Sequence, residues 1–311
     1  MTDIPAGMKP EDIFGWIPEE ARNRETQQAY EEEFALMQPL TTVGANLTGS
    51  GKGKVILLHK YLTELRGGRF PVNLQTIGDC VSHGYGKAIE NLMAVEILRK
   101  GENESFPALC ATEWLYGTGR VLVGKGRIGN QDGSLGTWQQ KAVREHGTLL
   151  RKKYGQHDLT TYSGKRAKDW GYKGLPLDLE TIADEHPVKS TAIVTSYEEA
   201  RDAIANGYPV AVCSSQGFEM KRDGEGFARP KGKWPHCMYF CAVDDEYKRP
   251  GLLCVNSWGE NWIDGPKRHD QPNGSFWVDA NICTKMLRGQ DSFALSNFEG
   301  YPSQEIDPRL F

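Results

Sequence analysis

Hydrophobic positions change their spacing along this chain of 311 residues. In the first two thirds they recur every three or four residues in several stretches, which is the period of an amphipathic helix. The longest stretch runs from Ser82 to Arg99, and Gly101 is placed to end it. Shorter stretches of the same kind are 134–146, 177–186 and 196–206. The pattern therefore predicts four helices before Gly207, the last of which carries a capping box formed by Ser196 and Glu199.

After Gly207 the pattern consists of short apolar runs separated by turn residues. These runs are 209–213, 238–243, 251–255 and 275–278. Their length and their flanking residues are typical of strands in an antiparallel sheet or barrel. Helices in the first part and strands in the second predict an α+β fold.

Residues 1–69 have a different character. They contain a charged stretch, 18–36, that favours a helix, a Gly-rich connector at 48–54, and a short apolar segment at 55–65 that fits either a strand or a helix. This apolar content is too small for a separate core. We expect an arm that lies over the rest of the protein or binds a partner in an assembly, with a mobile tail as the alternative.

Composition narrows the classes of partner and compartment. A net charge of −4 gives no specific signal for nucleic acid, and no apolar run approaches the roughly 20 residues of a membrane span. The chain begins without the basic and apolar segments of a secretory signal. Its seven cysteines are scattered and odd in number, which favours a reducing compartment: cytoplasmic, intracellular or inside a virus particle. Cys237 and Cys241 are at most half of a zinc site, so we expect no metal.

Three residue types in one chain order indicate chemistry. Cys80 opens the long predicted helix, His236 precedes a predicted strand, and Asn256 follows another. A thiol nucleophile, a base and a residue that orients the base have these identities. A helix N-terminus and a nearby imidazolium both lower a thiol pKa. Beside Cys80, we expect Asp79 to cap the helix and His83 to be a neutral histidine on its surface.

The segments Gln75-Thr76-Ile77-Gly78-Asp79-Cys80 and Asn256-Ser257-Trp258-Gly259-Glu260-Asn261-Trp262, with His236, resemble the papain-like cysteine peptidases over about residues 70–298. The resemblance implies a helical lobe at 70–190, an antiparallel β-barrel lobe at 191–311, and an active site between them, with 1–69 as the arm.

The resemblance also implies a role for each matching residue. Cys80 would be the nucleophile, His236 the base and Asn256 its orienter. The Cys80 N–H and the Gln75 amide would form the oxyanion hole, although Gln75 lies one residue nearer the cysteine than is usual in the family. The substrate-binding residues would be Gly133, Ser134 and Trp258, with Trp258 also shielding the His–Asn hydrogen bond.

The implied function is hydrolysis of a peptide or isopeptide bond in a peptide or protein substrate, without a metal or organic cofactor. Two alternatives remain open at this point. One is a catalytically inactive papain-fold component of an assembly such as a virus particle. The other is a thiol acyltransferase or amidase that passes the acyl group to an amine or acts on a non-protein amide.

Overall fold

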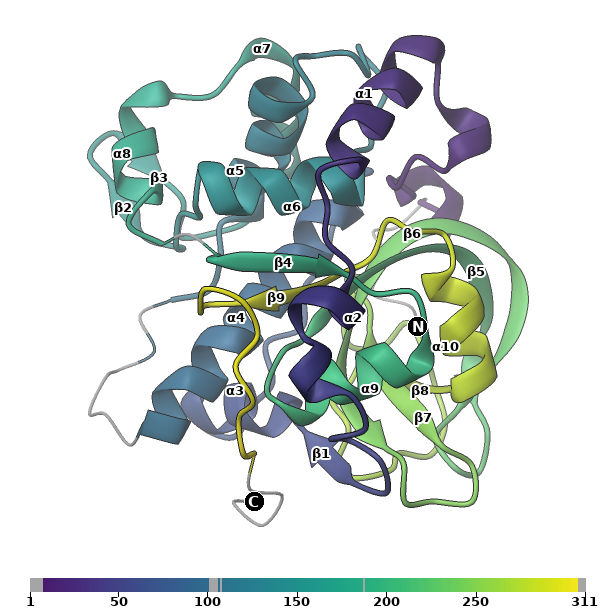
Figure 1. Ribbon diagram of the computed structural model, residues 1–311. Helices are drawn as coiled ribbons and strands as arrows, with labels where there is room; N and C mark the ends of the chain where they lie inside the picture. Colours follow the sequence, from purple (N-terminus) through teal and green to yellow (C-terminus); the bar gives the residue numbers. More distant parts are fainter. Residues whose placement is uncertain (1–7, 101–105, 107, 187, 307–311) are drawn as a thin grey trace.

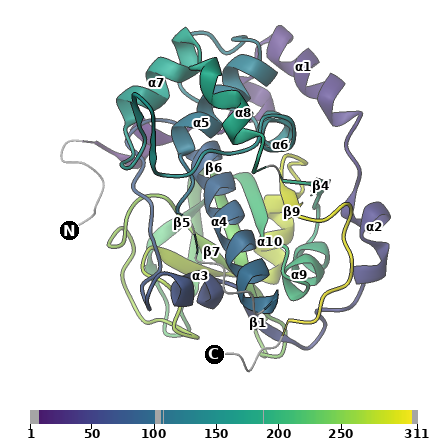
Figure 2. The same ribbon diagram turned by 90° about the vertical axis from the view of Figure 1, so that its left-hand side faces the viewer.

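The computed structural model describes residues 8–100, 106, 108–186 and 188–306. The chain forms two regions that meet along helix α4 (Cys80–Lys100) (Figure 1). Helices α1, α5, α6, α7 and α8 gather at one end, and the main sheet lies at the other. Figure 2 shows α4 running through the middle of the molecule from one region to the other.

The other helices and short helical turns follow one another along the chain. They are η1 (Pro10–Ile13), η2 (Glu19–Ala21), α1 (Arg24–Phe34), α2 (Leu40–Val43), η3 (Ala45–Leu47), α3 (His59–Leu65), α5 (Thr112–Gly117), η4 (Thr118–Val123), α6 (Gly136–Glu145), α7 (Gly164–Lys173), η5 (Leu177–Leu179), α8 (Glu180–Ala183), α9 (Tyr197–Ala205) and α10 (Ala280–Leu287). In the described part of the chain, no helix has both the length and the apolar composition that a membrane span requires.

The described strands form one large sheet and one small hairpin. They are β1 (Val55–Leu57), β2 (Lys153–Tyr154), β3 (His157–Asp158), β4 (Ser190–Ile193), β5 (Val210–Arg222), β6 (Ala228–Asp244), β7 (Gly251–Val255), β8 (Ser275–Asp279) and β9 (Phe293–Ser296). The large sheet has the order β4-β9-β5-β6-β7-β8, with β1 paired to β6, and every pairing in it is antiparallel.

The α+β class and the antiparallel sheet of the predicted barrel lobe are confirmed, and the sheet does not close into a complete barrel among the described residues. Strands β4 and β8 stand at opposite ends of the sheet order, and among the described residues they do not pair with each other. Backbone groups elsewhere in the chain form hydrogen bonds with the outer edges of these two strands instead. Ile193 N–H donates to the Gln38 carbonyl at 3.0 Å, and Trp277 N–H donates to the Gly226 carbonyl at 3.0 Å. Each outer edge of the open sheet therefore has a backbone partner from elsewhere in the chain.

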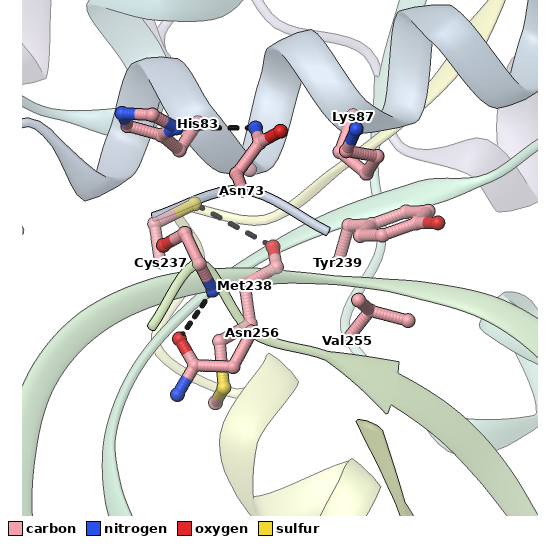
Figure 3. Close-up of a pocket in the computed structure, with 10 residues that line it drawn as sticks. Asn73, His83, Lys87, Cys237, Met238, Tyr239, Val255 and Asn256 are labelled. Atoms are coloured by element: carbon pink, nitrogen blue, oxygen red, sulfur yellow. Dashed lines mark hydrogen bonds between the residues drawn. The ribbon is translucent and has the colours of Figure 1, made fainter. Parts of the chain in front are cut away.

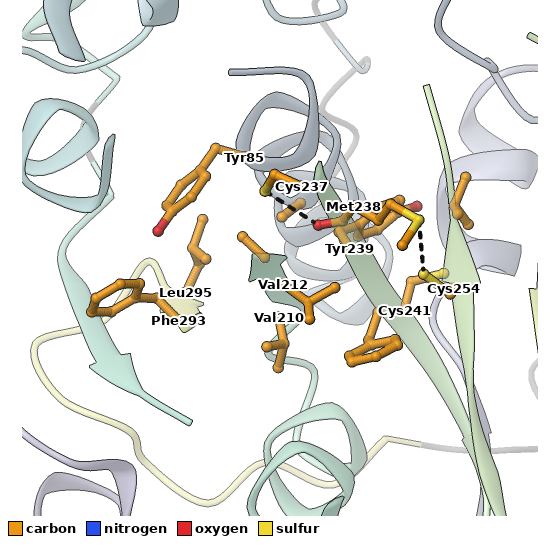
Figure 4. Close-up of a cluster of buried hydrophobic side chains, with 14 of the residues drawn as sticks. Tyr85, Val210, Val212, Cys237, Met238, Tyr239, Cys241, Cys254, Phe293 and Leu295 are labelled. Carbon is orange, nitrogen blue, oxygen red and sulfur yellow. Dashed lines mark hydrogen bonds between the residues drawn. The ribbon is translucent and has the colours of Figure 1, made fainter. Parts of the chain in front are cut away.

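Helix α4 confirms the longest predicted helix and places its first residue against the sheet. Figure 4 shows Tyr85 of α4 in a buried cluster with side chains of β5, β6 and β9, among them Val212, Cys237 and Leu295. A Cβ on Gly84 would lie 2.8 Å from the Cys237 sulfur and 2.9 Å from the Met238 carbonyl oxygen. Only glycine therefore allows α4 to approach β6 this closely. The predicted stop at Gly101 lies outside the described residues.

The shorter predicted helices had mixed outcomes. The stretches 134–146 and 196–206 are α6 and α9, and the Ser196 hydroxyl accepts the Glu199 N–H at 3.2 Å. The stretch 177–186 is only η5 followed by the short α8, and the next residue, Pro187, lies outside the described residues. The charged helix begins later than predicted because Asn23 caps α1 by accepting the Thr26 N–H.

Candidate active site

Cys80 is the first residue of α4 and is fully buried. Its sulfur accepts the backbone N–H of Cys237 on β6 at 3.3 Å. The helix N-terminus favours a thiolate at this position. Burial nevertheless raises the pKa of the Cys80 thiol well above its usual value, and the nearby Cys237 and Asp79 also raise it. Burial thus favours the protonated form of the Cys80 thiol in this conformation.

His236 and Asn256 are joined by a direct hydrogen bond. His236 Nε2 lies 2.7 Å from Asn256 Oδ1, and that same oxygen accepts the Ser257 N–H at 2.7 Å. Because an amide oxygen can only accept, Nε2 carries the proton and Nδ1 is left with its lone pair. Nδ1 has no partner among the described residues. His236 also directly precedes Cys237 in the sequence, and the Cys237 N–H donates a hydrogen bond to the Cys80 sulfur. His236 is therefore in the tautomer that can accept a proton, but among the described residues its Nδ1 makes no hydrogen bond to the Cys80 sulfur.

The environment of His236 is apolar. Burial lowers the pKa of the imidazole to about 4, against a smaller opposing effect of the bond to Asn256. Trp258 packs on the imidazole with ring centres 4.9 Å apart, and Trp234 packs on Trp258 at 4.9 Å. Trp258 is fully buried, so it covers the His–Asn pair and lines no open surface in this conformation.

Hydrogen bonds hold both the backbone and the side-chain amide of Gln75. Its backbone N–H donates to the Ser257 carbonyl at 2.9 Å, and its side-chain oxygen accepts the Ser257 hydroxyl. The side-chain N–H groups donate to the carbonyls of Ile13 at 2.7 Å and Ile77 at 2.9 Å. Backbone carbonyls therefore occupy the Gln75 side-chain donors in this conformation.

The carbonyl of Ile13 belongs to a segment that sequence analysis missed as part of the site. Residues 13–17, hereafter the covering segment, pass next to Cys80, where the Gly15 N–H lowers the thiol pKa against the larger opposing effect of burial. Trp16 N–H donates to the Pro235 carbonyl at 3.3 Å. The centres of the Phe14 and His236 rings are 6.1 Å apart. A Cβ on Gly15 would lie 1.9 Å from the Gly78 carbonyl oxygen. The only signal for this was the run Phe14-Gly15-Trp16-Ile17, a glycine between bulky apolar residues.

Gly133 and Ser134 contact the covering segment through their backbone. Ser134 N–H donates to the Gly15 carbonyl at 2.8 Å, and Ile17 N–H donates to the Ser134 carbonyl at 3.2 Å. A Cβ on Gly133 would lie 2.9 Å from the Gly15 carbonyl oxygen. Here Ser134 pairs in parallel with Trp16. The expected substrate-binding residues therefore hold an extended peptide, which belongs to the protein's own chain.

Asp79 and His83 behave differently from expectation. The Asp79 carboxylate accepts the Tyr162 hydroxyl at 2.9 Å and lies 3.4 Å from His83 Nε2, so it turns to these side chains instead of capping α4. His83 is buried, and its Nδ1 lies 3.1 Å from Asn73 Nδ2. These polar contacts fix the start of α4 behind Cys80.

A cavity of about 10 Å³ lies behind the catalytic candidates. Figure 3 shows Asn73, His83 and Lys87 on one side of it and Cys237, Met238 and Asn256 on the other. This volume is that of about one water molecule, so the cavity is too small for a substrate group. Within the described part of the chain, no group of three His, Cys, Asp or Glu side chains is placed to hold a metal ion.

Comparisons with known proteins bear on the fold. The sequence matches no family model and no curated protein sequence. Among solved structures, the chain is similar to xylellain, a cysteine protease from Xylella fastidiosa, with 15% identity, 96% of each chain covered and a TM-score of 0.52. It is also similar to the proform of the ragweed pollen cysteine protease Amb a 11, with 17% identity and a TM-score of 0.50. That match covers 80% of this chain and 60% of the ragweed chain. The chain therefore has the fold of the papain-like cysteine proteases.

Proposed function

We propose that the protein is a cysteine hydrolase that cleaves a peptide or isopeptide bond, with Cys80 as nucleophile, His236 as base and acid, and Asn256 as orienter. The observation that carries the proposal is the His236–Asn256 hydrogen bond, which leaves Nδ1 of His236 unprotonated and able to accept a proton. The papain-like fold supports it, because helix and sheet then each supply part of the catalytic group. Fold alone would not carry the assignment.

The reaction follows from these positions. His236 Nδ1 takes the thiol proton, and the Cys80 sulfur attacks the carbonyl carbon of the substrate. The carbonyl electrons move to oxygen. The resulting oxyanion accepts hydrogen bonds from the backbone N–H of Cys80 and the side-chain amide of Gln75. When the tetrahedral species collapses, the C–N bond breaks and the imidazolium protonates the leaving amine. A water molecule that gives its proton to His236 then hydrolyses the thioester and restores the thiol.

In the proposed enzyme the covering segment would hold the site inactive in the described conformation. It occupies a Gln75 donor and the backbone groups of Ser134, and it excludes water from Cys80 and His236. The pKa of the thiol is raised and that of the imidazole is lowered, so proton transfer between them is opposed. Displacement of the segment would rehydrate both groups and relax both shifts. We propose that activity requires this displacement.

The decisive experiment is labelling with an electrophilic thiol probe, followed by mass spectrometry of each cysteine. After the covering segment is displaced by Gly15→Ala, Cys80 should label first, and Cys80→Ala should abolish that labelling. Cys283→Ala is the matched control, because Cys283 is also buried but lies on α10 away from the site. Labelling of Cys80 no faster than that of the other cysteines would contradict the proposal.

Two other functions make different predictions. Full burial of Cys80 and His236 also fits a non-catalytic component of an assembly, which would show no selective Cys80 labelling after displacement. An acyltransferase would label like a hydrolase but would transfer the acyl group to an added amine. Product analysis with and without such an amine separates this last case.

A further inference from the structure

Three of the cysteines meet where the start of α4 packs on the sheet. The Cys80 sulfur accepts the N–H of Cys237 on β6 at 3.3 Å, and Cys213 of β5 lies directly opposite Cys237 in the strand register. All three are fully buried and none is in a disulfide. Hydrolysis as proposed above uses Cys80 alone, so it leaves the other two thiols without a role.

Cys237 lies between the other two thiols. Its sulfur would be 2.8 Å from a Cβ on Gly84, so its side chain faces α4, one helical turn beyond Cys80. After burial, Cys237 is the group that most raises the pKa of the Cys80 thiol. Burial also raises the pKa of Cys213, followed by Cys237 and, more weakly, by Cys80. Because such effects fall with distance, Cys237 is the nearer neighbour of both.

The backbone geometry of Cys213 and Cys237 suits a disulfide between the two strands. The Cys213 N–H donates to the Ser292 hydroxyl at 3.1 Å, and its carbonyl accepts the same hydroxyl at 3.4 Å. The Cys237 N–H points to Cys80 instead of to Cys213. The two residues are therefore a non-hydrogen-bonded pair, in which Cα atoms are about 4.5 Å apart and side chains are closest. A disulfide requires about 4.4 to 6.8 Å between Cα atoms.

We propose that Cys237 and Cys213 reduce Cys80 after hydrogen peroxide has oxidised it, so that the oxidation ends as a disulfide between β5 and β6. This goes beyond the proposed hydrolysis, because it needs a reactive Cys80 but no peptide substrate. A sulfenic acid that meets no second thiol is oxidised further to sulfinic and sulfonic acids, which thiols do not reverse. A thiol already in contact with Cys80 prevents that loss.

Each step transfers the oxidation to the next sulfur. The Cys80 thiolate attacks the peroxide, an S–O bond forms and the O–O bond breaks, and the departing hydroxide takes the proton that the thiol had lost. The Cys237 sulfur then displaces the hydroxyl group of the Cys80 sulfenic acid, which leaves as water with the Cys237 proton. Cys213 next attacks the Cys237 sulfur, the disulfide to Cys80 breaks, and the Cys213 proton passes to Cys80. One peroxide thus gives two water molecules and one disulfide, and Cys80 is again a thiol.

The test treats the full chain carrying Gly15→Ala with one equivalent of hydrogen peroxide, without any peptide. Disulfides are then mapped by mass spectrometry of unreduced tryptic peptides. Cys237 and Cys241 share a tryptic peptide, because no lysine or arginine separates them, so this parent also carries Cys241→Ala. We expect a Cys213–Cys237 disulfide and full recovery of the iodoacetamide labelling of Cys80. The chain that keeps Gly15 should give the same disulfide more slowly, because its covering segment excludes the oxidant.

Removing each partner thiol should stop the sequence at a different stage. Cys213→Ala should accumulate a Cys80–Cys237 disulfide, with a loss of Cys80 labelling that dithiothreitol restores. Cys237→Ala should accumulate sulfinic and sulfonic acid at Cys80, a loss that dithiothreitol does not restore. Cys254→Ala is the matched control, because this buried thiol of β7 contacts the Met238 sulfur at 3.6 Å, and it should behave like the parent.

The role of Cys80 as the first thiol oxidised is tested by Cys80→Ala, which should prevent the Cys213–Cys237 disulfide. Formation of that disulfide at an unchanged rate in Cys80→Ala would overturn the inference. So would a lasting loss of Cys80 labelling in the parent, or equal amounts of sulfinic acid with and without Cys237. A protein that shows the expected disulfides but cleaves no peptide would contradict only the proposed hydrolysis.

Discussion

Gly15 lies so close to Gly78 that a single added methyl group cannot fit between them. A Cβ on Gly15 would stand 1.9 Å from the Gly78 carbonyl oxygen, which is backbone two residues before Cys80. The contact makes glycine necessary at the centre of the covering segment. It also provides a way to displace the segment without touching the catalytic candidates.

Gly15→Ala should therefore increase the reactivity of Cys80. Each unit by which the thiol pKa falls raises the thiolate fraction about tenfold near neutral pH, so we expect at least about a tenfold faster reaction with iodoacetamide. The control is Gly224→Ala, because a Cβ on Gly224 meets nothing within 4 Å. Equal Cys80 labelling rates in the two variants would show that the segment does not restrict the thiol.

The pH dependence of labelling should separate the covered and uncovered states. In the full chain the raised pKa of Cys80 keeps the thiol protonated at neutral pH, so its labelling should rise only in the alkaline range. In Gly15→Ala the same rise should begin at lower pH, because rehydration and the imidazolium both favour the thiolate. Superimposable profiles in stopped-flow alkylation would contradict this.

Burial of His236 should make stability fall in mild acid. Its folded pKa of about 4 lies below the ordinary value of 6.5, so between these values the unfolded chain binds a proton that the folded chain does not. Stability is therefore complete above pH 6.5 and is lost as pH falls towards 4, by up to about 3 kcal/mol from this residue. Urea unfolding at pH 7 and pH 4.5 measures the loss, and His236→Gln should show less of it. The same slope in both proteins would assign the loss to other groups.

Asn256→Ala should weaken catalysis without abolishing it. In the Gly15→Ala background we expect peptide turnover to fall by at least about tenfold, because the imidazole loses the partner that fixes its tautomer and orientation. Cys80→Ala and His236→Ala should eliminate turnover. Asn273→Ala, an exposed asparagine outside the site, is the control. Turnover unchanged by Asn256→Ala would mean that the hydrogen bond has no catalytic role.

Gln75→Ala should lower kcat more than it raises KM. An oxyanion donor acts mainly in the transition state, so its removal is expected to reduce kcat by about 100- to 1000-fold. Ser257→Ala tests the alternative that Gln75 only supports the local fold, since Ser257 bonds the Gln75 oxygen but would not contact the oxyanion. If Ser257→Ala reduced kcat as strongly as Gln75→Ala, positioning would explain the result.

Much of the fold was predictable where hydrophobic residues alone decide the structure. Strand β7 has the predicted bounds Gly251–Val255, because all five residues are buried. Helix α7 was missed because its buried residues are Gly164, Ala167 and Gly171, which give no apolar period. Strands β5 and β6 continue well beyond their predicted runs, since their outer halves carry many polar residues on an exposed hairpin. Pairing between neighbouring strands, which no local pattern reveals, extends them.

The candidate site was predictable only in part, for a similar reason. The side chains of Cys80, His236 and Asn256 carry recognisable chemistry, and the His–Asn contact follows their order. The covering segment acts mainly through backbone carbonyls and N–H groups, which every residue possesses. The hydrogen bond from Trp16 Nε1 to the Asp291 carboxylate spans 275 residues of sequence. Neither feature leaves a local signature, so both required the three-dimensional structure.

In the proposed hydrolase, the covering segment would compete with substrate as an intramolecular ligand, because it belongs to the same chain as the site that it covers. Short flexible tethers give effective concentrations in the millimolar range, so a free peptide at micromolar concentration is outcompeted even when its intrinsic affinity is equal. Cutting the chain between Ile17 and α1 would change this balance while the contacts of Ile13, Gly15 and Trp16 with the site are kept. The released piece would become dilutable, and its occupancy would then depend on protein concentration.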